Sequence, residues 1–343
     1  MADPVAGSPQ AHRPNPRSTA SLEWTLTSGG EYDTAMPRMQ QNALVVLGPT
    51  ASGKTRLGVQ LARALGGEII SADSRQVYRG LDIGSGKDLT EYVVDGVTIP
   101  HHLIDVADLS QEFSVFDYQQ RFYEAFTSLR SRGVLPVVVG GTGLYLEAAI
   151  KGYRMVAVPK NAALRAELDA LSTRQLEDHL TSLKDRLHNV TDLENRDRLI
   201  RAIEIAVYSR DHDPDPAPEI RPLIIGVQWD RRELRVRILV RLRHRFEAGM
   251  IEEVAGLHEK GVPWERLEQL GLEYRFIAEY LEGRIRTKND LVQKLHSAIC
   301  QFAKRQDTWF RRMERNGFTI RWIPRGDLRV AVQVIEKAQG VQA

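Results

Sequence analysis

The chain has 343 residues, of which 42% are hydrophobic and 27% are charged, and its formal net charge at pH 7 is +2. This composition is that of an ordinary globular protein, and the length allows one large domain with an insertion or two domains. A single cysteine, Cys300, excludes an intrachain disulfide framework and a cysteine-rich zinc module, and no apolar run reaches the roughly 18 residues that a membrane helix needs.

Residues 1–40 are rich in Pro, Ser, Ala and polar residues and have little apolar periodicity, which predicts a disordered tail. Their low acid content is compatible with a transit peptide, but Asp3 and the prolines disfavour the amphipathic helix of such a peptide. Cys300 is expected to be a small buried side chain, and the scarcity of cysteine favours a reducing compartment. We therefore expect a cytoplasmic protein with no membrane association.

Strand and helix signals alternate after the tail. The predicted order is a strand at 43–47, a helix at 54–65, strands at 67–74 and 101–106, a helix at 114–132, and a strand at 134–145 that opens through Gly-Gly-Thr into a turn and another helix. Such alternation predicts an α/β fold with a parallel sheet.

Strand signals disappear from residue 156 onwards. Residues 160–210 have helical periodicity with many charges, and "DHDPDPAPEI" at 211–220 has the proline density of a linker. We expect a helical insertion at 156–215 within an α/β core formed by residues 41–155 and 216–327. The predicted remainder is a strand at 221–229, helices at 231–248, 250–260, 273–283 and 288–315, an edge strand at 318–323, and a C-terminal tail helix at 328–343.

The segment "GPTASGKT" lies between the first predicted strand and helix and predicts a phosphate-binding loop. Its first glycine permits a tight turn, after which consecutive N–H groups converge on phosphate oxygens at the start of the helix. The lysine supplies a positive charge to a terminal phosphate, and the hydroxyl of Thr55 can bind Mg²⁺. The predicted binding residues are Gly48, Pro49, Thr50, Ala51, Ser52, Gly53, Lys54 and Thr55.

Acidic residues at strand ends are the next candidates for chemistry. Phosphoryl-transfer proteins with such a loop usually hold Mg²⁺ with an acid at the end of a second buried strand. The strand that begins at Val134 ends in Gly-Gly-Thr, which leaves Asp73 and Asp105. Asp73 is expected at the crevice beside the phosphate loop. It is either a general base for an incoming nucleophile or a loop aspartate that caps a helix or binds Mg²⁺.

Seven arginines and one glutamate occupy "RRELRVRILVRLRHR" at 231–245, which suits a polyanionic partner. Arg237, Arg241 and Arg245 share one helical face because they are four residues apart, beside an apolar stripe made of Leu234, Ile238, Leu242 and Phe246. The row either lines a site at the edge of the core or is a solvated basic face. His101 and His102 are expected to be structural, since no acidic or cysteine cluster has metal-ligand spacing.

Seven segments taken together resemble the tRNA dimethylallyltransferases, also called tRNA isopentenyltransferases. They are "GPTASGKT", "GEIISADSRQVYRGLDIG", "HHLID", "VVVGGTGLY", "RLIRAIEI", "RRELRVRI" and "TWFRR", and the resemblance covers about residues 43–325. It implies a P-loop NTPase-like sheet with an inserted helical domain that grips RNA. The implied reaction transfers a dimethylallyl group from dimethylallyl diphosphate to N6 of adenosine 37, next to the anticodon of tRNA.

The resemblance also implies roles for individual residues. Asp73 is the expected general base, and Thr50, Lys54, Thr55 and Arg241 are expected to hold the diphosphate, with Mg²⁺ at Thr55. The family's partner is the anticodon stem-loop of tRNA, and we expect the enzyme to be a monomer. The residues expected along the tRNA path are Asp73, Ser74, Arg75, Gln76, Thr142, Arg198 and Arg201.

Three segments depart from the family's usual pattern, and in one of them, "LENRDRLIR" at 193–201, the N-D-x-x-R of the family's insertion is scrambled. "DIGSGKD" at 82–88 stands where the family has "DIGTAKP", and "LGLEYR" at 270–275 is two residues longer than the family's motif. The departures bear on the identity of the acceptor more than on the reaction, so a free adenine nucleotide and a different RNA are alternative acceptors. A small-molecule kinase that uses ATP is the alternative that the phosphate loop alone allows. A non-catalytic RNA-binding paralogue is disfavoured by the intact Asp73, Lys54 and Arg241.

Overall fold

A six-stranded sheet, in which every strand runs parallel to its neighbours, is the centre of the molecule. The computed structural model describes residues 41–183 and 196–340, so the predicted tail at 1–40 lies outside the described residues. The strand order is β5-β2-β6-β1-β7-β8, which confirms the predicted parallel α/β sheet. The strands are β1 (Ala43–Leu47), β2 (Gly67–Ala72), β5 (His101–His102), β6 (Leu135–Gly140), β7 (Pro222–Gln228) and β8 (Ile320–Pro324).

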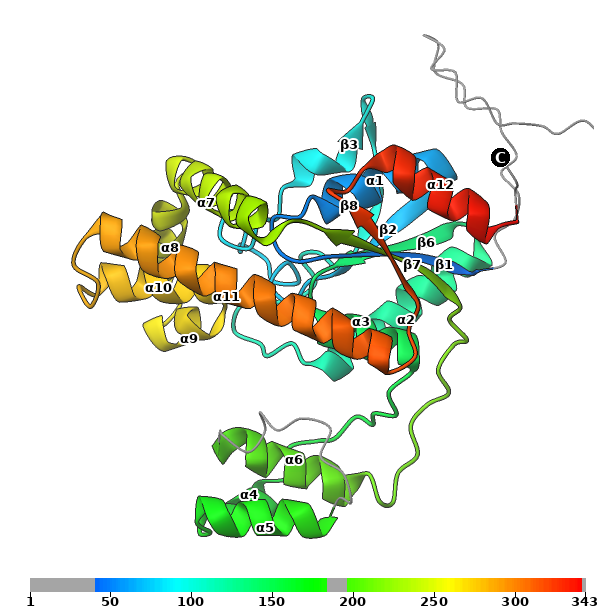
Figure 1. Cartoon of the computed structure of the whole chain (residues 1–343). Coiled ribbons are helices and arrows are strands. Elements are labelled where there is room, and N and C mark those ends of the chain that lie inside the picture. Colours follow the sequence, from blue (N-terminus) through cyan, green and yellow to red (C-terminus); the bar gives the residue numbers. More distant parts are fainter. Residues whose placement is uncertain (1–40, 184–195, 341–343) are drawn as a thin grey trace, which may run out of the picture.

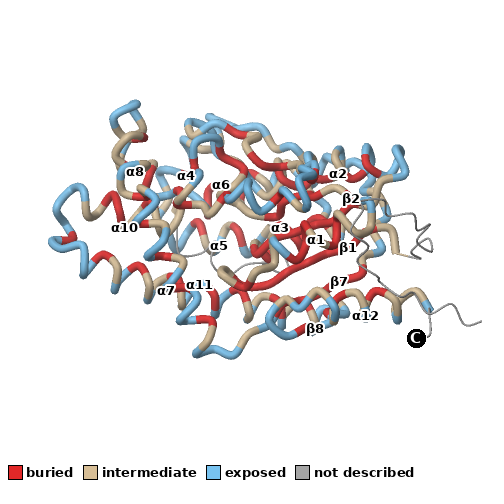
Figure 2. The backbone as a smooth tube through the Cα atoms, turned by 90° about the horizontal axis from the view of Figure 1, so that it is seen from above, coloured by how far each residue is buried: buried red, intermediate tan, exposed pale blue. Residues whose placement is uncertain are grey.

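Helices cover both faces of the sheet, so its central strands are apolar on both sides. Leu44 and Val46 pack toward α1 (Lys54–Leu65) and α12 (Leu328–Ala338), and the alternate residue Val45 packs toward the opposite face. That face is covered by α2 (Val115–Ser131), α3 (Gly143–Lys151) and part of α11 (Lys288–Arg315) (Figure 1). The central strands form a continuous buried run in Figure 2.

The predicted strand at 101–106 is wrong in length, because β5 contains only His101 and His102. Leu103 has φ of 63° and Asp105 has φ of 56°, and these left-handed conformations turn the chain away from the sheet. The backbone then runs beside the loop after β2, where the N–H of Asp105 donates to the carbonyl oxygen of Gln76 at 3.0 Å. Strand β2 also ends two residues earlier than its prediction, at Ala72.

Helix boundaries follow the caps that the sequence contains. Helix α2 begins after Ser114, which forms a reciprocal capping box with Asp117, and the chain leaves it at Gly133 with φ of 73°. Helix α11 has the predicted bounds, starting after the cap Thr287. The tail helix α12 is shorter than predicted, since it ends at Ala338 and Gly340 has a positive φ.

A second group of helices extends the core at one end of the sheet (Figure 1). They are α7 (Arg231–Glu247), α8 (Met250–Glu259), α9 (Trp264–Gln269) and α10 (Leu272–Leu281), and they share a core with the first half of α11. Helix α9 was not predicted, since six residues are too few to establish a helical period. The hairpin of β3 (Val93–Val94) and β4 (Val97–Thr98), with the short helix η1 (Leu89–Tyr92), was also missed.

The helices α4 (Ala162–Asp169), α5 (Thr173–Leu183) and α6 (Arg196–Tyr208) lie apart from the sheet (Figure 1). Burial raises the pKa of Glu204 on α6, but hydrogen bonds from Arg165, the Asn161 backbone and Arg201 outweigh it and lower the pKa to about 2. The helices α4, α5 and α6 have a core of their own, formed by Leu168, Leu176, Leu180, Leu199, Ile200, Ile203 and Ala206.

None of the helices in the described part of the chain is long and apolar enough to cross a membrane.

The two chain segments that join α4–α6 to the rest of the molecule run next to each other. Arg154 on the outgoing segment donates to Oδ1 of Asp213 on the returning one at 2.8 Å. A Cβ atom placed on Gly152 would lie 3.6 Å from the Cβ of Ala217. Together with α2, the two segments line a cavity of about 780 Å³.

Candidate functional site

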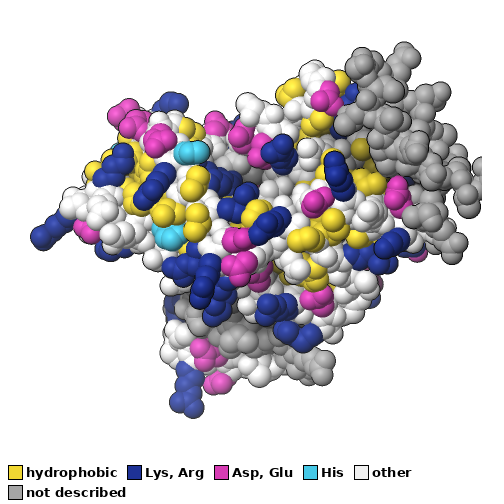
Figure 3. Space-filling view, turned by 45° about the horizontal axis from the view of Figure 1, so that its top comes forward, with side chains coloured by type: hydrophobic (Ala, Val, Ile, Leu, Met, Phe, Trp, Pro, Cys, Tyr) yellow, Lys and Arg dark blue, Asp and Glu magenta, His cyan; other side chains and the backbone are white. Residues whose placement is uncertain are grey.

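A cavity of about 1200 Å³ lies at the carboxyl ends of β1, β2 and β6. This is the edge of a parallel sheet at which ligands bind, because the loops and helix N-termini converge there. In the space-filling view, basic side chains gather in the middle of the face shown, between the helical end of the molecule and the sheet (Figure 3). The walls come from the phosphate loop, the loops at 73–76 and 82–88, α7, residues 268–275 and α11.

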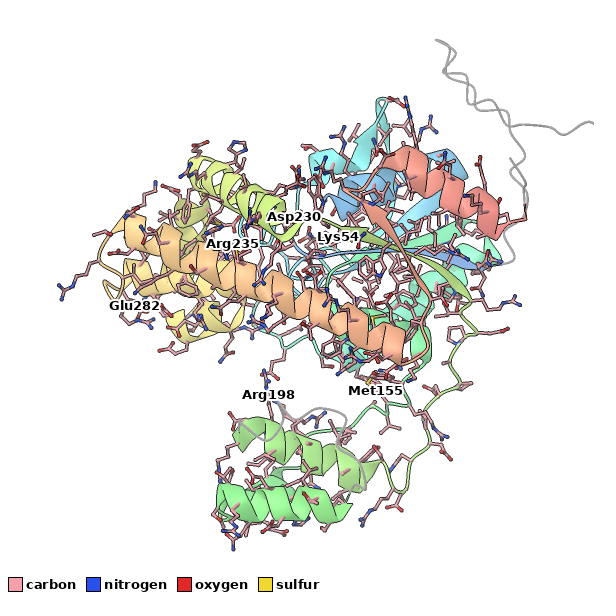
Figure 4. All side chains as sticks on the ribbon, in the orientation of Figure 1. Lys54, Met155, Arg198, Asp230, Arg235 and Glu282 are labelled. Carbon is pink, nitrogen blue, oxygen red and sulfur yellow. The ribbon has the colours of Figure 1, made fainter. Side chains whose placement is uncertain are left out.

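The loop from Gly48 to Thr55 joins β1 to α1 with a phosphate-loop backbone. Gly53 has φ of 85° and Ala51 has φ of 61°, and a Cβ on Gly48 would lie only 2.8 Å from Oγ of Ser52. The left-handed turns and the close approach explain why glycine is needed at Gly48 and Gly53. Lys54 lies near the start of α7, at the middle of the molecule (Figure 4). Its Nζ donates to the carbonyl oxygen of Pro49 at 3.4 Å.

The cavity holds more positive charge than its surroundings neutralise. Burial, with a smaller contribution from Arg241 and Arg245, lowers the pKa of Lys54 to about 8, although Asp73 opposes this shift. Burial likewise lowers the pKa of Arg241 to about 10, again reinforced by Arg245. Cations that are desolvated and close to one another gain most from a bound anion, so the site suits a polyanionic ligand.

The arginine row of α7 faces this cavity and is not an ordinary solvated surface. Arg237 donates through Nε to the carbonyl oxygen of Ala51 at 2.9 Å, and its guanidinium lies 4.2 Å from the ring of Trp229. Nη1 of Arg241 donates to Oγ1 of Thr50 at 3.3 Å. The apolar stripe beside the row is buried as predicted, so the helix is fixed in this orientation by Leu234, Ile238, Leu242 and Phe246.

Asp73 uses one carboxylate oxygen in a turn, and its other oxygen takes no part in that turn. Its Oδ1 accepts the backbone N–H groups of Arg75 at 2.9 Å and Gln76 at 3.4 Å. Among the described residues, Oδ2 has no hydrogen-bond partner, although Asp73 lines the cavity. Asp73 thus closes a turn with one oxygen and caps no helix, which leaves the other oxygen available for chemistry.

Asp105, the other acidic residue considered at a strand end, is unsuited to bind a metal ion at the phosphate loop. Its Oδ1 lies 2.5 Å from Nζ of Lys87, which also contacts Oδ1 of Asp82 at 2.8 Å. Lys87 is buried and donates to the carbonyl oxygen of Tyr78 as well. Asp105 thus anchors the loop at 82–88 from behind and does not line the cavity.

Two of the segments that depart from the family pattern touch each other, and the third, at 193–201, lies partly outside the described residues. Glu253 accepts the backbone N–H groups of Ile83 at 2.6 Å and Gly84 at 3.1 Å, and it also accepts the hydroxyl of Tyr274 at 2.8 Å. A Cβ on Gly84 would lie 2.6 Å from the ring of Tyr274. "DIGSGKD" and "LGLEYR" are therefore one packed unit that forms a wall of the cavity.

Gly86 in this wall provides space for the arginine row. Its φ is 71°, and a Cβ there would lie 1.6 Å from Nη2 of Arg245 and 2.2 Å from Nη2 of Arg241. Nη1 of Arg245 donates to the carbonyl oxygen of Gly84 at 3.3 Å and lies 3.4 Å from Oε1 of Glu273. Any side chain at this position would require both guanidinium groups to move and would have to adopt a positive φ.

The residues expected along an RNA path fall into two places. Ser74, Arg75, Gln76 and Thr142 line the cavity, and Oγ1 of Thr142 accepts the N–H of Ser74 at 3.1 Å. The other two residues lie outside the cavity, on α6.

The two arginines of α6 differ in their surroundings. Arg201 donates to Glu204 at 3.1 Å and to the carbonyl oxygen of Val158 at 2.7 Å, so it stabilises the insertion. Arg198 lies on the side of the insertion that faces the core (Figure 4).

Histidine and cysteine side chains have structural surroundings. Nε2 of His102 lies 2.8 Å from Oε2 of Glu68, and the ring of His101 lies against Tyr92. Cys300 is partly buried, not fully buried as predicted, and its Sγ lies 3.4 Å from Nε2 of His296. Within residues 41–183 and 196–340, no three His, Cys, Asp or Glu side chains are grouped to hold a metal ion.

Sequence reasoning missed Gln306, a buried side chain of α11 at the floor of the cavity. Its carboxamide bonds to Thr50 of the phosphate loop and to Gly141 of the loop after β6. The signal was present, because Gln306 is the polar member of the buried stripe Leu291, Leu295, Ile299, Ala303, Gln306, Phe310 and Met313. A glutamine at helical spacing among apolar residues needs buried partners.

Comparisons with known proteins agree with this geometry. The IPP transferase family model matches residues 76–313, and the isopentenyl transferase model matches residues 41–105. The chain is 58% identical over 285 residues to tRNA dimethylallyltransferase 1 of Geotalea uraniireducens, covering 83% of this chain and 93% of the relative. It is 57% identical over 287 residues to tRNA dimethylallyltransferase 2 of Syntrophotalea carbinolica, covering 83% and 95%.

Two solved structures resemble this chain over most of its length. The full-length tRNA isopentenylpyrophosphate transferase of Bacillus halodurans superposes with a TM-score of 0.61 at 32% identity, covering 88% of this chain and 99% of that one. A eukaryotic dimethylallyltransferase acting on tRNA has the same fold, with a TM-score of 0.68 at 22% identity over 84% of this chain and 75% of that one. The family match spans the sheet, the helical end and the insertion, so the chain is a member of the IPP transferase family.

Proposed function

We propose that this protein transfers a dimethylallyl group from dimethylallyl diphosphate to N6 of adenosine 37, next to the anticodon of tRNA, and releases diphosphate. One observation carries the proposal. Asp73, with an unpaired carboxylate oxygen, and the pair of Arg241 and Thr50 line the same cavity. A base for the acceptor and a cationic site for the leaving group are thus present together, and relatives named tRNA dimethylallyltransferase support tRNA as the acceptor.

On the donor side, the residues suit a diphosphate that departs. Charge develops on the diphosphate oxygens as the allylic C–O bond breaks, and positioned cations stabilise that charge. Lys54 and Arg241 supply cations whose lowered pKa values reflect desolvation, and Thr50 is held against Arg241. These contacts favour the transition state because the charge on the leaving group increases along the reaction.

The site also suits Mg²⁺ held largely by the donor. Thr55 lines the cavity with a hydroxyl, and Mg²⁺ is commonly bound by few protein ligands together with substrate phosphates and water. That the described residues lack a cluster of three acidic or histidine side chains agrees with such a donor-held ion. When bound, Mg²⁺ would neutralise diphosphate charge, with Thr55 as its protein ligand.

On the acceptor side, Asp73 would take the proton of the adenine amine. N6 attacks C1 of the dimethylallyl group, and the C1–O bond breaks with its electron pair leaving on diphosphate. The N6 proton passes to Oδ2 of Asp73, while Oδ1 stays in its turn with Arg75 and Gln76. Because the adenine amine is a weak nucleophile, removal of its proton is the step that needs this carboxylate.

The RNA would be held in two places. An adenosine that is extruded from the anticodon loop reaches the cavity past Ser74, Arg75, Gln76 and Thr142. The insertion, with Arg198 on its core-facing side and Arg201 within its ion network, would hold the anticodon stem-loop. The enzyme would act as a monomer in the cytoplasm, where the tRNA substrate is found.

One experiment separates the candidate reactions. The protein is incubated with labelled dimethylallyl diphosphate and Mg²⁺, together with either total tRNA or AMP. We expect label in tRNA and release of diphosphate. Label in AMP would assign a free adenine nucleotide as acceptor. Parallel reactions with γ-labelled ATP test the kinase alternative, which requires release of ADP and a labelled phosphorylated product.

A further inference from the structure

The buried carboxamide of Gln306 joins the two loops that carry the donor and acceptor residues. Its Oε1 accepts the backbone N–H of Thr50 at 2.8 Å, and its Nε2 donates to the carbonyl oxygen of Gly141 at 2.8 Å. Only one orientation of an amide satisfies both partners, because the first needs an acceptor and the second needs a donor. A carboxylate, a methyl or a longer side chain cannot make both bonds at neutral pH.

Gln306 is held in place by the rest of α11. It is 7% exposed and lies on the buried stripe of the helix, with Ala303 at 3% and Phe310 at 0% on either side. A Cβ on Gly141 would lie 2.5 Å from Nε2 of Gln306 and 3.3 Å from Cε of Lys54. The carboxamide therefore fills the space between the two loops, and its position is set by a helix of 28 residues.

Each loop that Gln306 contacts leads directly to a reactive group. On the donor side, Thr50 also accepts the hydrogen bond of Arg241 through Oγ1. On the acceptor side, Gly141 precedes Thr142, whose Oγ1 accepts the N–H of Ser74, the residue next to Asp73. A shift of either loop relative to the other would change the separation of the leaving group and the base.

On these contacts, and resting on the proposed prenyl transfer, we propose that Gln306 is a positioning residue that sets the donor loop and the acceptor loop at their reactive separation. It acts through the two loops that it joins and takes no part in the bond changes. Its effect is on the rate of the bound complex, because misplacement of reacting groups lowers kcat even where binding survives.

The test measures kcat and KM of Gln306→Met and Gln306→Glu in the full chain, with dimethylallyl diphosphate and tRNA. For Gln306→Met, which loses both hydrogen bonds, we expect kcat to fall at least ~10-fold while KM for tRNA changes less than about threefold. Gln306→Glu keeps the acceptor for Thr50 but places a carboxylate against the carbonyl oxygen of Gly141. Only the protonated carboxyl can donate there.

The pH dependence of Gln306→Glu distinguishes positioning from a merely structural role. We expect the ratio of its kcat to that of the wild type to rise as the pH falls from about 8 to about 6, since a buried carboxyl titrates above its usual range. The ratio is used because Lys54, Asp73, Arg241 and Arg305, which line the same cavity, are present in both proteins. A flat ratio, or Gln306→Met with the kcat of the wild type, would overturn the inference.

Gln119 on α2 is the matched control. It is 2% exposed, and its Nε2 donates to the carbonyl oxygens of Ala148 at 2.8 Å and Tyr153 at 3.0 Å, outside the main cavity. Gln119→Met should lower the melting temperature without lowering kcat per folded molecule, and an equal loss of kcat would contradict the positioning role. If the wild type transfers no prenyl group to any acceptor, the proposed function fails and takes this inference with it.

Discussion

The guanidinium of Arg241 donates a hydrogen bond to Oγ1 of Thr50, across 191 positions of the sequence and 3.3 Å of space. The bond ties the arginine row of α7 to the phosphate loop. It places a cation where the leaving group of the proposed reaction would develop charge.

Replacement of Arg241 by alanine should therefore weaken transition-state binding. We expect kcat/KM for dimethylallyl diphosphate to fall at least ~10-fold in Arg241→Ala, because a charged contact to the leaving group is lost. Arg243→Ala is the matched control, since Arg243 is exposed on the same helix and does not line the cavity. Equal values for the two variants in steady-state assays would show that the arginine row contributes only surface charge.

Asp73→Asn tests the proposed base. The amide retains an oxygen for the N–H groups of Arg75 and Gln76 but cannot take the proton of the adenine amine. We expect kcat to fall by about 10²-fold or more, while the Kd of dimethylallyl diphosphate, measured by calorimetry, changes little. Asp108→Asn, at an exposed ion pair with Arg79, is the control. Near-normal turnover of Asp73→Asn would remove Asp73 from this role.

The lowered pKa of Lys54 predicts that activity declines at alkaline pH. Its pKa in the free protein is lowered to about 8, chiefly by burial, so the cation that binds diphosphate is lost as the pH rises through about 8. We expect kcat/KM for the donor to be constant below this pH and to fall above it. In Lys54→Arg the guanidinium stays charged, so the decline near pH 8 should disappear even if the maximum is lower. A decline at the same pH in both proteins would assign it to another group.

Gly86→Ala tests the close contact between the wall and the arginine row. An alanine Cβ would occupy the place of Nη2 of Arg245 and Arg241, so both guanidinium groups must move. We expect kcat/KM for the donor to fall at least ~10-fold, since the charged contact to the leaving group is displaced. Gly96→Ala is the control, because Gly96 has φ of 76° and nothing within 4 Å of its Cβ position. Gly96→Ala should carry only the backbone strain, about 1 kcal/mol, with unchanged kinetics.

The sheet and its order of elements were predictable because local signals agree there. The buried run Ala43–Leu47, the phosphate loop and the capping box at Ser114 each select one local structure. The turn after His102 was not predictable, since Leu103, whose side chain seldom allows a left-handed conformation, adopts one together with Asp105. Tertiary hydrogen bonds to the loop after β2 select that path, and a local pattern cannot contain them.

The site residues that belong to one local motif were predictable from the sequence. Those whose hydrogen-bond partners lie far away in the sequence were not. Asp73 and Lys54 were identified because loop and strand positions place them at one sheet edge. The bond of Gln306 to Thr50 joins residues 256 positions apart, and nothing local to α11 marks its partner. The contact of Glu253 with Ile83 is of the same kind, joining α8 to a loop that precedes it by 170 positions.

The two adjacent segments that connect α4–α6 to the core determine how readily the insertion can be replaced. Arg154 and Asp213 meet, so the chain leaves the core and re-enters it at one point. A short loop could join the two sides there without altering the path of any strand that builds the cavity. We therefore expect that α4–α6 can be replaced as a unit by a short loop while Asp73, Lys54 and Arg241 remain where they are.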